Sequence, residues 1–163
     1  MENLTWLEVQ RLMQGARSMK ARTIIRTLVN TGIRSGEAAS LDVEDVDYER
    51  RQLRILDSKK HEYAYVPIDV ETLRWIRHLV RDRKRGPLFP SQKAARYTST
   101  GIRLVVRRAA QRAGFEPTRR VPPRALRHTF ACLWDDRHGS LRGLQQILRH
   151  TRLSSTQHYL DRS

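Results

Sequence analysis

The sequence predicts a mainly α-helical domain with a small antiparallel β-sheet, an α+β fold. Apolar residues recur at helical spacing through most of the 163 residues. The period changes to alternation only in two neighbouring segments, 51–56 and 62–68. No repeat, low-complexity segment or internal linker interrupts this pattern, so we expect residues 1–163 to form a single domain.

The N-terminal segments predict three helices. Thr5-Trp6-Leu7-Glu8 has the pattern of a capping box, so a short helix should follow to about Gly15. Residues 18–31 carry apolar side chains at helical spacing, and Gly32 suits the C-terminal end of that helix. Another short helix is expected from Ser35 to Leu41.

The two alternating segments predict a β-hairpin. They are joined by Asp57-Ser58-Lys59-Lys60-His61, which is polar and typical of a turn. Asp69 then suits the N-cap of a helix. The apolar residues expected on the inner face of that helix are Leu73, Ile76, Leu79 and Val80.

Four more helices are predicted after the charged run 81–85 and Gly86-Pro87. They are expected at about Ser99 to Ala113, from Pro122-Pro123 to a break at Gly139, at 141–148, and as a short helix opening at Ser154-Ser155-Thr156. Proline suits the first helical turn because its missing N–H has no partner there in any case. Residues 116–121 are expected to form a loop.

The chain is strongly basic. Lys and Arg number 32 against 17 Asp and Glu, which gives a formal net charge of +15, and 27 of the basic residues are arginine. Such a domain repels itself, and the planar arginine fork pairs two donors with phosphate oxygens. The charge therefore favours a nucleic-acid partner, although a solvated basic surface is the alternative.

Several protein classes are not indicated. Cys132 is the single cysteine, so no internal disulfide can form, and its apolar neighbours favour a buried structural thiol over a nucleophile. No segment approaches the length of a membrane span, and the N-terminus lacks signal-peptide character, so we expect a soluble intracellular protein. No convincing metal-ligand cluster or glycine-rich phosphate loop is recognisable.

Four separated segments hold residues suited to phosphoryl transfer. In the first, Thr31–Glu37, Arg34 follows Gly32 at the start of a helix, where it can clamp a phosphate beside free backbone N–H groups. In the second, Lys59 lies in the hairpin turn, from which a lysine can reach a DNA groove and donate a proton. A solvated turn residue is the alternative for Lys59, and Lys60 and His61 compete for the same role.

The third segment contains Arg124 and Arg127, three residues apart and hence on one helical face. Near the first turn, where the helix dipole favours an anion, the two arginines can hold a phosphate; ordinary surface charge is the alternative. The fourth segment contains His150 and Tyr159. A tyrosine, with a pKa of about 10, becomes a useful nucleophile only if cations stabilise the phenolate, and a half-buried aromatic is the alternative.

In order, spacing and local context, these segments resemble the tyrosine recombinase (phage-integrase) family over nearly the whole chain. Thr31–Glu37 is similar to the first-arginine box, and Lys59 lies seven residues before Val66-Pro67-Ile68, as the hairpin lysine of the family does. The other matching segments are Leu126–Ala131 for the second-arginine box, and Leu148-Arg149-His150 with Leu153–Tyr159 for the terminal box.

The resemblance implies the tyrosine recombinase catalytic-domain fold and a site-specific recombinase or integrase, of the kind found in mobile genetic elements, that acts on double-stranded DNA. By that resemblance Tyr159 attacks the scissile phosphate, forming a 3′-phosphotyrosyl link and freeing a 5′-hydroxyl. Arg34 and Arg127 hold the non-bridging oxygens, Lys59 protonates the leaving 5′-oxygen, and His150 hydrogen-bonds the phosphate. The resemblance implies no cofactor and no metal, because the covalent link stores the bond for rejoining.

Two departures from the family pattern matter. Arg124 stands where the family usually has a histidine, and arginine cannot act as a base, so Arg124 is expected to serve only as a phosphate contact. The family's N-terminal core-binding domain is expected to be absent, and the chain ends four residues after Tyr159. We therefore expect weak DNA binding and a monomer in isolation. The resemblance implies a synaptic tetramer of protomers on DNA for a full-length protein, and a protein that acts on DNA is expected in the cytoplasm, associated with the nucleoid.

Three alternatives remain open from the sequence. The first is a catalytically weak or inactive recombinase-like module that binds DNA, which Arg124 and the ends of the chain motivate. A plain basic helical protein that binds DNA or RNA explains the charge but not the four ordered segments. Type IB topoisomerases share the chemistry, and site preference would distinguish a recombinase from them.

Overall fold

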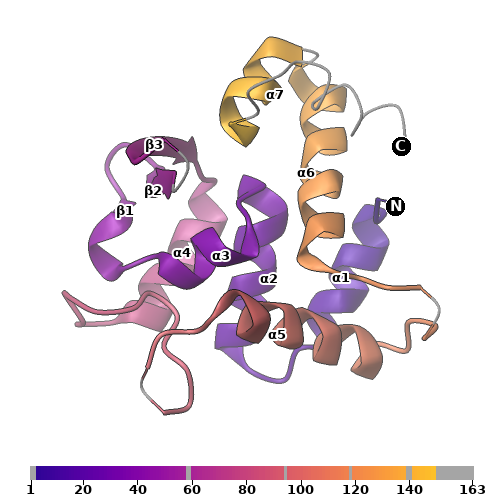
Figure 1. Cartoon of the computed structure of the whole chain (residues 1–163). Coiled ribbons are helices and arrows are strands. Elements are labelled where there is room, and N and C mark those ends of the chain that lie inside the picture. The colour runs from indigo at the N-terminus through magenta and orange to yellow at the C-terminus, as the bar shows by residue number, and fades with distance from the viewer. Residues whose placement is uncertain (1–2, 58–59, 94, 118, 139–140, 150–163) are drawn as a thin grey trace.

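Residues 3–57, 60–93, 95–117, 119–138 and 141–149 are described by the computed structural model. Over these ranges the chain forms helices packed beside a small antiparallel sheet, which confirms the predicted fold class (Figure 1). The elements are α1 (Trp6–Gly15), α2 (Met19–Thr31), α3 (Ser35–Ser40), the 3-10 helix η1 (Val43–Asp45), β1 (Val46–Asp47), β2 (Gln52–Asp57), β3 (Glu62–Pro67), α4 (Val70–Val80), α5 (Ser99–Arg112), α6 (Pro123–His138) and α7 (Leu141–Leu148). Of the described helices, none is long and apolar enough to cross a membrane.

Helix α2 is the centre of the helical part and contacts α1, α3, α4, α5 and α6. Its apolar residues are fully buried, as the helical spacing predicts: Ile24, Ile25, Leu28 and Val29. Three buried threonines accompany them: Thr23, Thr27 and Thr31. Each threonine hydroxyl donates to the backbone carbonyl four residues earlier, at 2.6–2.7 Å. These bonds allow polar side chains to lie inside the core without unsatisfied donors.

Gly32 ends α2 in a left-handed backbone conformation, with φ of +71°. The predicted helix end is therefore confirmed, and glycine is required there for two reasons. Most side chains avoid a positive φ. A β-carbon at this position would also lie 2.4 Å from the ring of Phe130 on α6. The close approach brings the turn after α2 directly against α6.

The predicted hairpin is confirmed by strands β2 and β3, which pair antiparallel with Leu53 opposite Val66 and Ile55 opposite Ala64. The alternation in β2 places Leu53 and Ile55 in the core. A third strand, β1, extends the sheet and was not predicted, because its two residues are too short to show a period. The backbone N–H of Lys60 donates to the Asp57 carboxylate at 3.3 Å on the far side of the turn.

The remaining predicted helices are also present, apart from the one opening at residues 154–156, which lies outside the described residues. Asp69 caps α4 by accepting the backbone N–H of Thr72 at 3.1 Å, as predicted. The expectation that Cys132 is fully buried is wrong, because it is only partly buried on α6. The preceding residue, Ala131, faces the core instead, because consecutive residues of a helix point in different directions.

Helix α7 packs on the second half of α6 through a small apolar cluster. Its buried members are Phe130, Ala131, Leu144 and Leu148, with Trp134 and Ile147 at the margin. Phe130 belongs to this cluster, and its ring also packs against Gly32. The C-terminal end of α7 is thereby held close to the turn after α2 (Figure 1).

Candidate active site

Arg127 occupies the point where three distant segments meet. It lies on α6 and is only 3% exposed. Its two terminal nitrogens each donate to a backbone carbonyl, Nη1 to Gly32 at the end of α2 and Nη2 to Leu148 at the end of α7, the latter at 2.6 Å. A buried guanidinium needs such acceptors, because an unsatisfied buried charge is costly. Arg127 therefore connects the first-arginine segment to the terminal segment.

Arg34 stands two residues beyond Gly32, at the N-terminal end of α3. Its side chain is 47% exposed, and it lies 3.5 Å from the Glu37 carboxylate. The sequence suggested free backbone N–H groups at this helix start, but the Arg34 N–H itself donates to Glu37 Oε1 at 2.8 Å. The exposed guanidinium is therefore available to an anion while its backbone is fixed by the glutamate.

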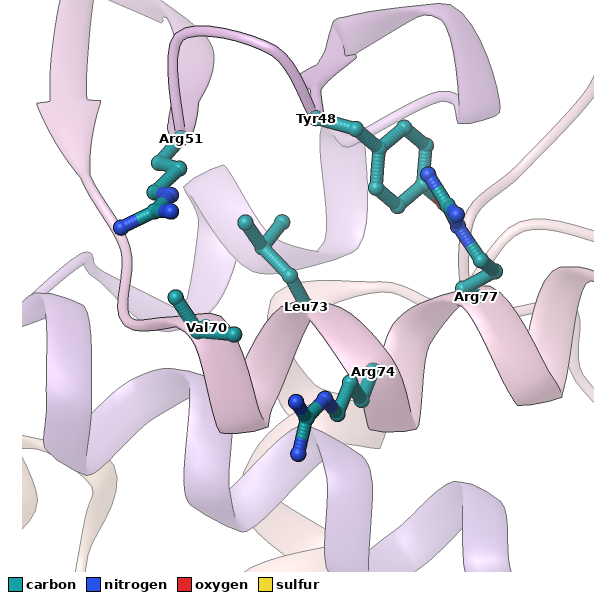
Figure 2. A pocket seen from close by; sticks show the side chains of 6 residues that line it. All are labelled: Tyr48, Arg51, Val70, Leu73, Arg74 and Arg77. Atoms are coloured by element: carbon teal, nitrogen blue, oxygen red, sulfur yellow. The ribbon is translucent and has the colours of Figure 1, made fainter.

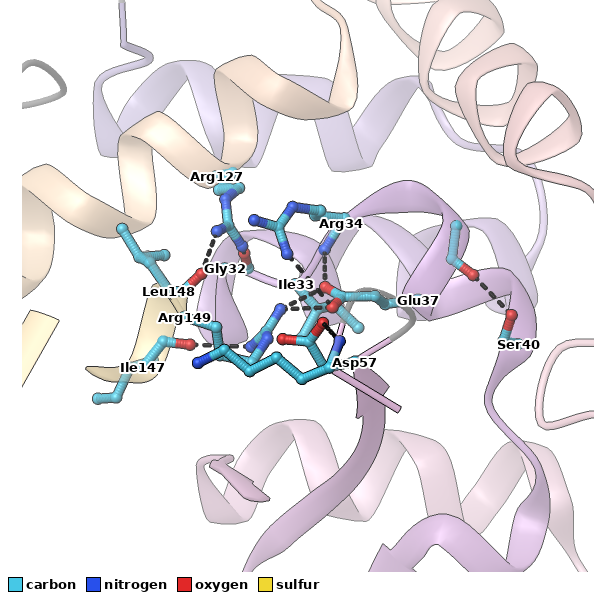
Figure 3. Close-up of polar contacts among 12 residues, drawn as sticks. Gly32, Ile33, Arg34, Glu37, Ser40, Asp57, Arg127, Ile147, Leu148 and Arg149 are labelled. Carbon is cyan, nitrogen blue, oxygen red and sulfur yellow. Dashed lines mark hydrogen bonds and ion pairs between the residues drawn. The ribbon is translucent and has the colours of Figure 1, made fainter. Parts of the chain in front are cut away.

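Sequence reasoning missed two residues of this site, Glu37 and Arg149. Nη2 of Arg149 donates to both carboxylate oxygens of Glu37, at 2.6 Å for Oε2. Both side chains are nearly buried, at 5% exposed for Arg149 and 11% for Glu37. Figure 3 shows Arg34, Arg127 and Arg149 gathered around the turn that leads from Gly32 into α3. Both residues lie inside segments that the sequence singled out, Glu37 in the first and Arg149 in the terminal one, but no local pattern indicated that they pair with each other.

Arg124 differs from Arg127 in its surroundings, although both lie in the first turns of α6. Arg124 is exposed, whereas Arg127 is buried. The helical spacing predicts that both side chains share one face of α6. In the structure the Arg124 side chain faces solvent, whereas the Arg127 guanidinium is inside the protein. Among the described residues Arg127 can organise the site, and Arg124 can only approach a ligand from solvent.

Three further candidates, Lys59, His150 and Tyr159, lie outside the described residues. The described chain reaches both sides of Lys59, at Asp57 and Lys60, and stops at Arg149, one residue before His150. The structure thus brings Arg34 and Arg127 together and places the beginning of the terminal segment against them. The positions of the other three candidates stay predictions.

The arrangement is suited to binding an oxyanion. Arg34 and Arg149 pair with the Glu37 carboxylate, and Arg127 and Asp57 lie beside the same turn (Figure 3), so the positive groups outnumber the negative ones. Fixed donors of this kind stabilise charge that develops on phosphate oxygens. Within the described ranges no group of three or more histidine, cysteine, aspartate or glutamate side chains could hold a metal ion.

A separate surface pocket lies between the β1–β2 turn and α4. Its lining residues are Tyr48, Arg51, Val70, Leu73, Arg74 and Arg77 (Figure 2). The Arg77 guanidinium lies over the Tyr48 ring, 4.4 Å from its centroid. Burial raises the pKa of Tyr48, and Arg77 partly opposes that effect. A raised pKa disfavours a nucleophilic phenolate, and none of the candidate residues lines this pocket.

Helices packed beside a three-stranded antiparallel sheet, with the buried Arg127 and the exposed Arg34 at the turn that ends α2, are typical of the tyrosine recombinase catalytic-domain class. The crystal structure of the XerA recombinase superposes with a TM-score of 0.88 at 28% identity, covering 98% of this chain and 60% of that one. The XerH site-specific recombinase, solved bound to its difH substrate, has the same fold, with a TM-score of 0.83 at 23% identity over 98% of this chain and 50% of that one.

The chain belongs to the phage integrase family, whose family model matches residues 2–163. Tyrosine recombinase XerC of Proteus mirabilis is 30% identical over 149 residues, which are 87% of this chain and 47% of that protein. Tyrosine recombinase XerA of Saccharolobus solfataricus is 29% identical over 154 residues, 94% of this chain and 50% of that protein. The chain thus spans about half the length of these relatives.

Proposed function

We propose that residues 1–163 form the catalytic domain of a tyrosine-type site-specific recombinase that cleaves and rejoins double-stranded DNA. The observation that carries the proposal is the buried Arg127, hydrogen-bonded to Gly32 in the first-arginine segment and to Leu148 in the terminal segment. Membership of the phage integrase family supports the same chemistry. The cytoplasm, where nucleoid DNA is held, is the proposed location.

The proposed reaction is a phosphoryl transfer without net hydrolysis. The Tyr159 hydroxyl loses its proton to solvent as its oxygen attacks the scissile phosphorus, and the bond from phosphorus to the 5′-oxygen breaks. Lys59 gives its proton to that leaving oxygen, while Arg34 and Arg127 balance the negative charge on the non-bridging oxygens and His150 hydrogen-bonds one of them. Attack by a 5′-hydroxyl on the phosphotyrosine reverses these steps and rejoins a strand.

The proposed partners follow from this reaction. Double-stranded DNA is the substrate, and the isolated domain is proposed to be a monomer. Cleavage of two duplexes requires four active sites, so a synaptic tetramer of protomers on DNA is proposed for the recombining assembly. In the second arginine segment the exposed Arg124 is proposed to contact a phosphate rather than move a proton.

A suicide-substrate assay tests this function. Duplex DNA that is nicked, or carries a phosphorothiolate bond, at a candidate site is incubated without metal with this chain and with Tyr159→Phe, and products are separated on a denaturing gel. We expect a covalent protein–DNA band only when Tyr159 is present. Filter binding of the same DNA measures affinity in parallel.

Each outcome separates the functions. An adduct formed equally by Tyr159→Phe would show that the nucleophile is wrong. Measurable binding of a cognate site with no adduct would favour the recombinase-like DNA-binding module, for which Arg124 in place of a histidine is the motivating observation. Relaxation of supercoiled DNA without site preference would favour a topoisomerase activity.

A further inference from the structure

Arg149 adopts a backbone conformation that its side chain does not favour. It directly follows α7 and has φ of +59°, in the left-handed region. Glycine or asparagine is the usual residue where a helix ends in this conformation, because a β-carbon is disfavoured there. The position therefore holds an arginine against the local backbone preference.

The side chain of Arg149 is also buried against the usual preference of a charged group. It is 5% exposed, and its Nη2 contacts both oxygens of Glu37 while Nη1 donates to the Ile147 carbonyl at 2.9 Å. Burying a charge is unfavourable unless a partner of opposite charge meets it in good geometry. The Glu37 carboxylate compensates the buried charge of Arg149, although Nε of Arg149 has no hydrogen-bond partner among the described residues.

Two arginines consequently fasten consecutive residues at the end of α7 to one turn. Arg127 donates to the carbonyl of Leu148 and to that of Gly32, and Arg149 reaches from the next residue to Glu37 (Figure 3). Gly32 and Glu37 bracket Arg34, the exposed candidate for phosphate binding. The end of α7 and the Arg34 turn are thus held in one fixed relation.

We propose that Arg149 is a positioning residue of the active site. Its ion pair with Glu37 fixes the point from which the chain continues to His150 and Tyr159, relative to the Arg34 and Arg127 guanidinium groups. The inference rests on the proposed recombinase function for its catalytic consequence. The ion pair's effect on the end of α7 is independent of that function.

The structural part is tested first, by hydrogen–deuterium exchange of the free protein. Arg149→Gly suits the positive φ and removes only the side chain, and Glu37→Gln keeps an oxygen for the Arg34 N–H but removes the charge. In both variants we expect exchange in α7 to rise by about 10-fold or more, with α5 unchanged. Arg149→Lys, which keeps the charge, should fall between wild type and Arg149→Gly. Unchanged exchange in α7 overturns the inference.

The catalytic part is tested by single-turnover adduct formation on nicked DNA, with the dissociation constant measured separately. We expect Arg149→Gly to slow adduct formation by about 10- to 100-fold, as small misplacements of reacting groups do, while DNA affinity is unchanged. Arg149→Lys should recover part of the rate. Arg74→Ala, which removes an exposed charge on α4, controls for loss of charge and should keep the wild-type rate.

The two measurements distinguish failure of this inference from failure of the proposed function. If wild-type protein forms no adduct, the proposed function fails, and the exchange of α7 still decides whether Arg149 fastens that helix. If the adduct rate of Arg149→Gly equals that of wild type, or falls only in parallel with DNA affinity, Arg149 is not a positioning residue for the reaction.

Discussion

A guanidinium can hold two acceptors at once, and Arg127 uses this property to join the ends of α2 and α7. A lysine carries its donors on a single nitrogen and cannot replace the two separate guanidinium nitrogens that hold these carbonyls. The same side chain is therefore needed for the fold and for the proposed phosphate contact. Substitution by lysine keeps the positive charge at this position but removes the two-pronged hydrogen bonding.

We predict that Arg127→Lys destabilises the protein by about 1–3 kcal/mol, because a buried backbone carbonyl loses its donor. Adduct formation should also fall below detection in the suicide-substrate assay. Urea denaturation followed by circular dichroism measures the stability. Arg124→Lys is the matched control on the same helix, and since Arg124 is exposed its stability should stay within about 0.5 kcal/mol of wild type. Equal stabilities of Arg127→Lys and wild type would contradict the bridging role.

Gly32→Ala is expected to destabilise the protein by about 2–4 kcal/mol, from backbone strain at positive φ and from overlap with the Phe130 ring. Gly36→Ala is the control, because a β-carbon there meets nothing nearer than Ser99 Cβ at 3.9 Å. Thermal unfolding of both variants measures the difference. Similar melting temperatures for the two would show that the turn after α2 can move away from α6 at little cost.

At the residue scale the sequence predicts the arginine segments but not the contact that joins them. Gly32 and Arg34 are recognisable because a helix end and a charged residue are encoded locally. The ion pair between Glu37 and Arg149 spans 112 residues of chain and depends on how α7 docks on α6. No local pattern encodes that distance, nor the left-handed backbone at Arg149.

At the scale of elements, the residue that caps α1, Glu8, takes part in one contact that the sequence predicts and in one that it does not. The predicted capping box is present, with the Glu8 N–H donating to Thr5 Oγ1 at 3.2 Å and the Thr5 N–H donating to Glu8 Oε2 at 2.8 Å. Glu8 also forms a bidentate ion pair with Arg119, from the loop before α6. The cap was readable from four consecutive residues, whereas the ion pair required the packed fold.

The Arg119 guanidinium, with the Thr5 backbone N–H, holds the pKa of Glu8 below its ordinary value near 4.5. A carboxylate with a lowered folded-state pKa stabilises the protein fully above its unfolded pKa, and this contribution is lost as the pH falls from about 4.5 toward the folded-state pKa. We therefore predict that wild type loses more stability between pH 6 and pH 3.5 than Glu8→Gln does. Urea denaturation at each pH measures this, and equal losses would contradict the role of Glu8.

In the sheet, the length of a strand determines whether it can be predicted from the sequence. Alternation over six residues in β2 and in β3 was sufficient to predict the hairpin, because each strand presents one face to the core. Strand β1 has two residues and pairs only through Val46 opposite Leu53 and Asp47 opposite Gln52. Its strand state is set by the neighbour already in place, so pairing and not sequence pattern determines it.

At the scale of the whole molecule, a net charge of +15 on 163 residues makes counterion release the main electrostatic term in DNA binding. For about five phosphate contacts, the logarithm of the association constant should fall with the logarithm of salt concentration with a slope of about −4.5. Arg124→Gln should reduce that slope by about 1 if Arg124 contacts a phosphate. Fluorescence anisotropy with labelled duplex across a salt series measures both slopes. A slope near zero would rule out a phosphate-dominated interface, and an unchanged slope in Arg124→Gln would leave the exposed guanidinium of α6 without a role on DNA.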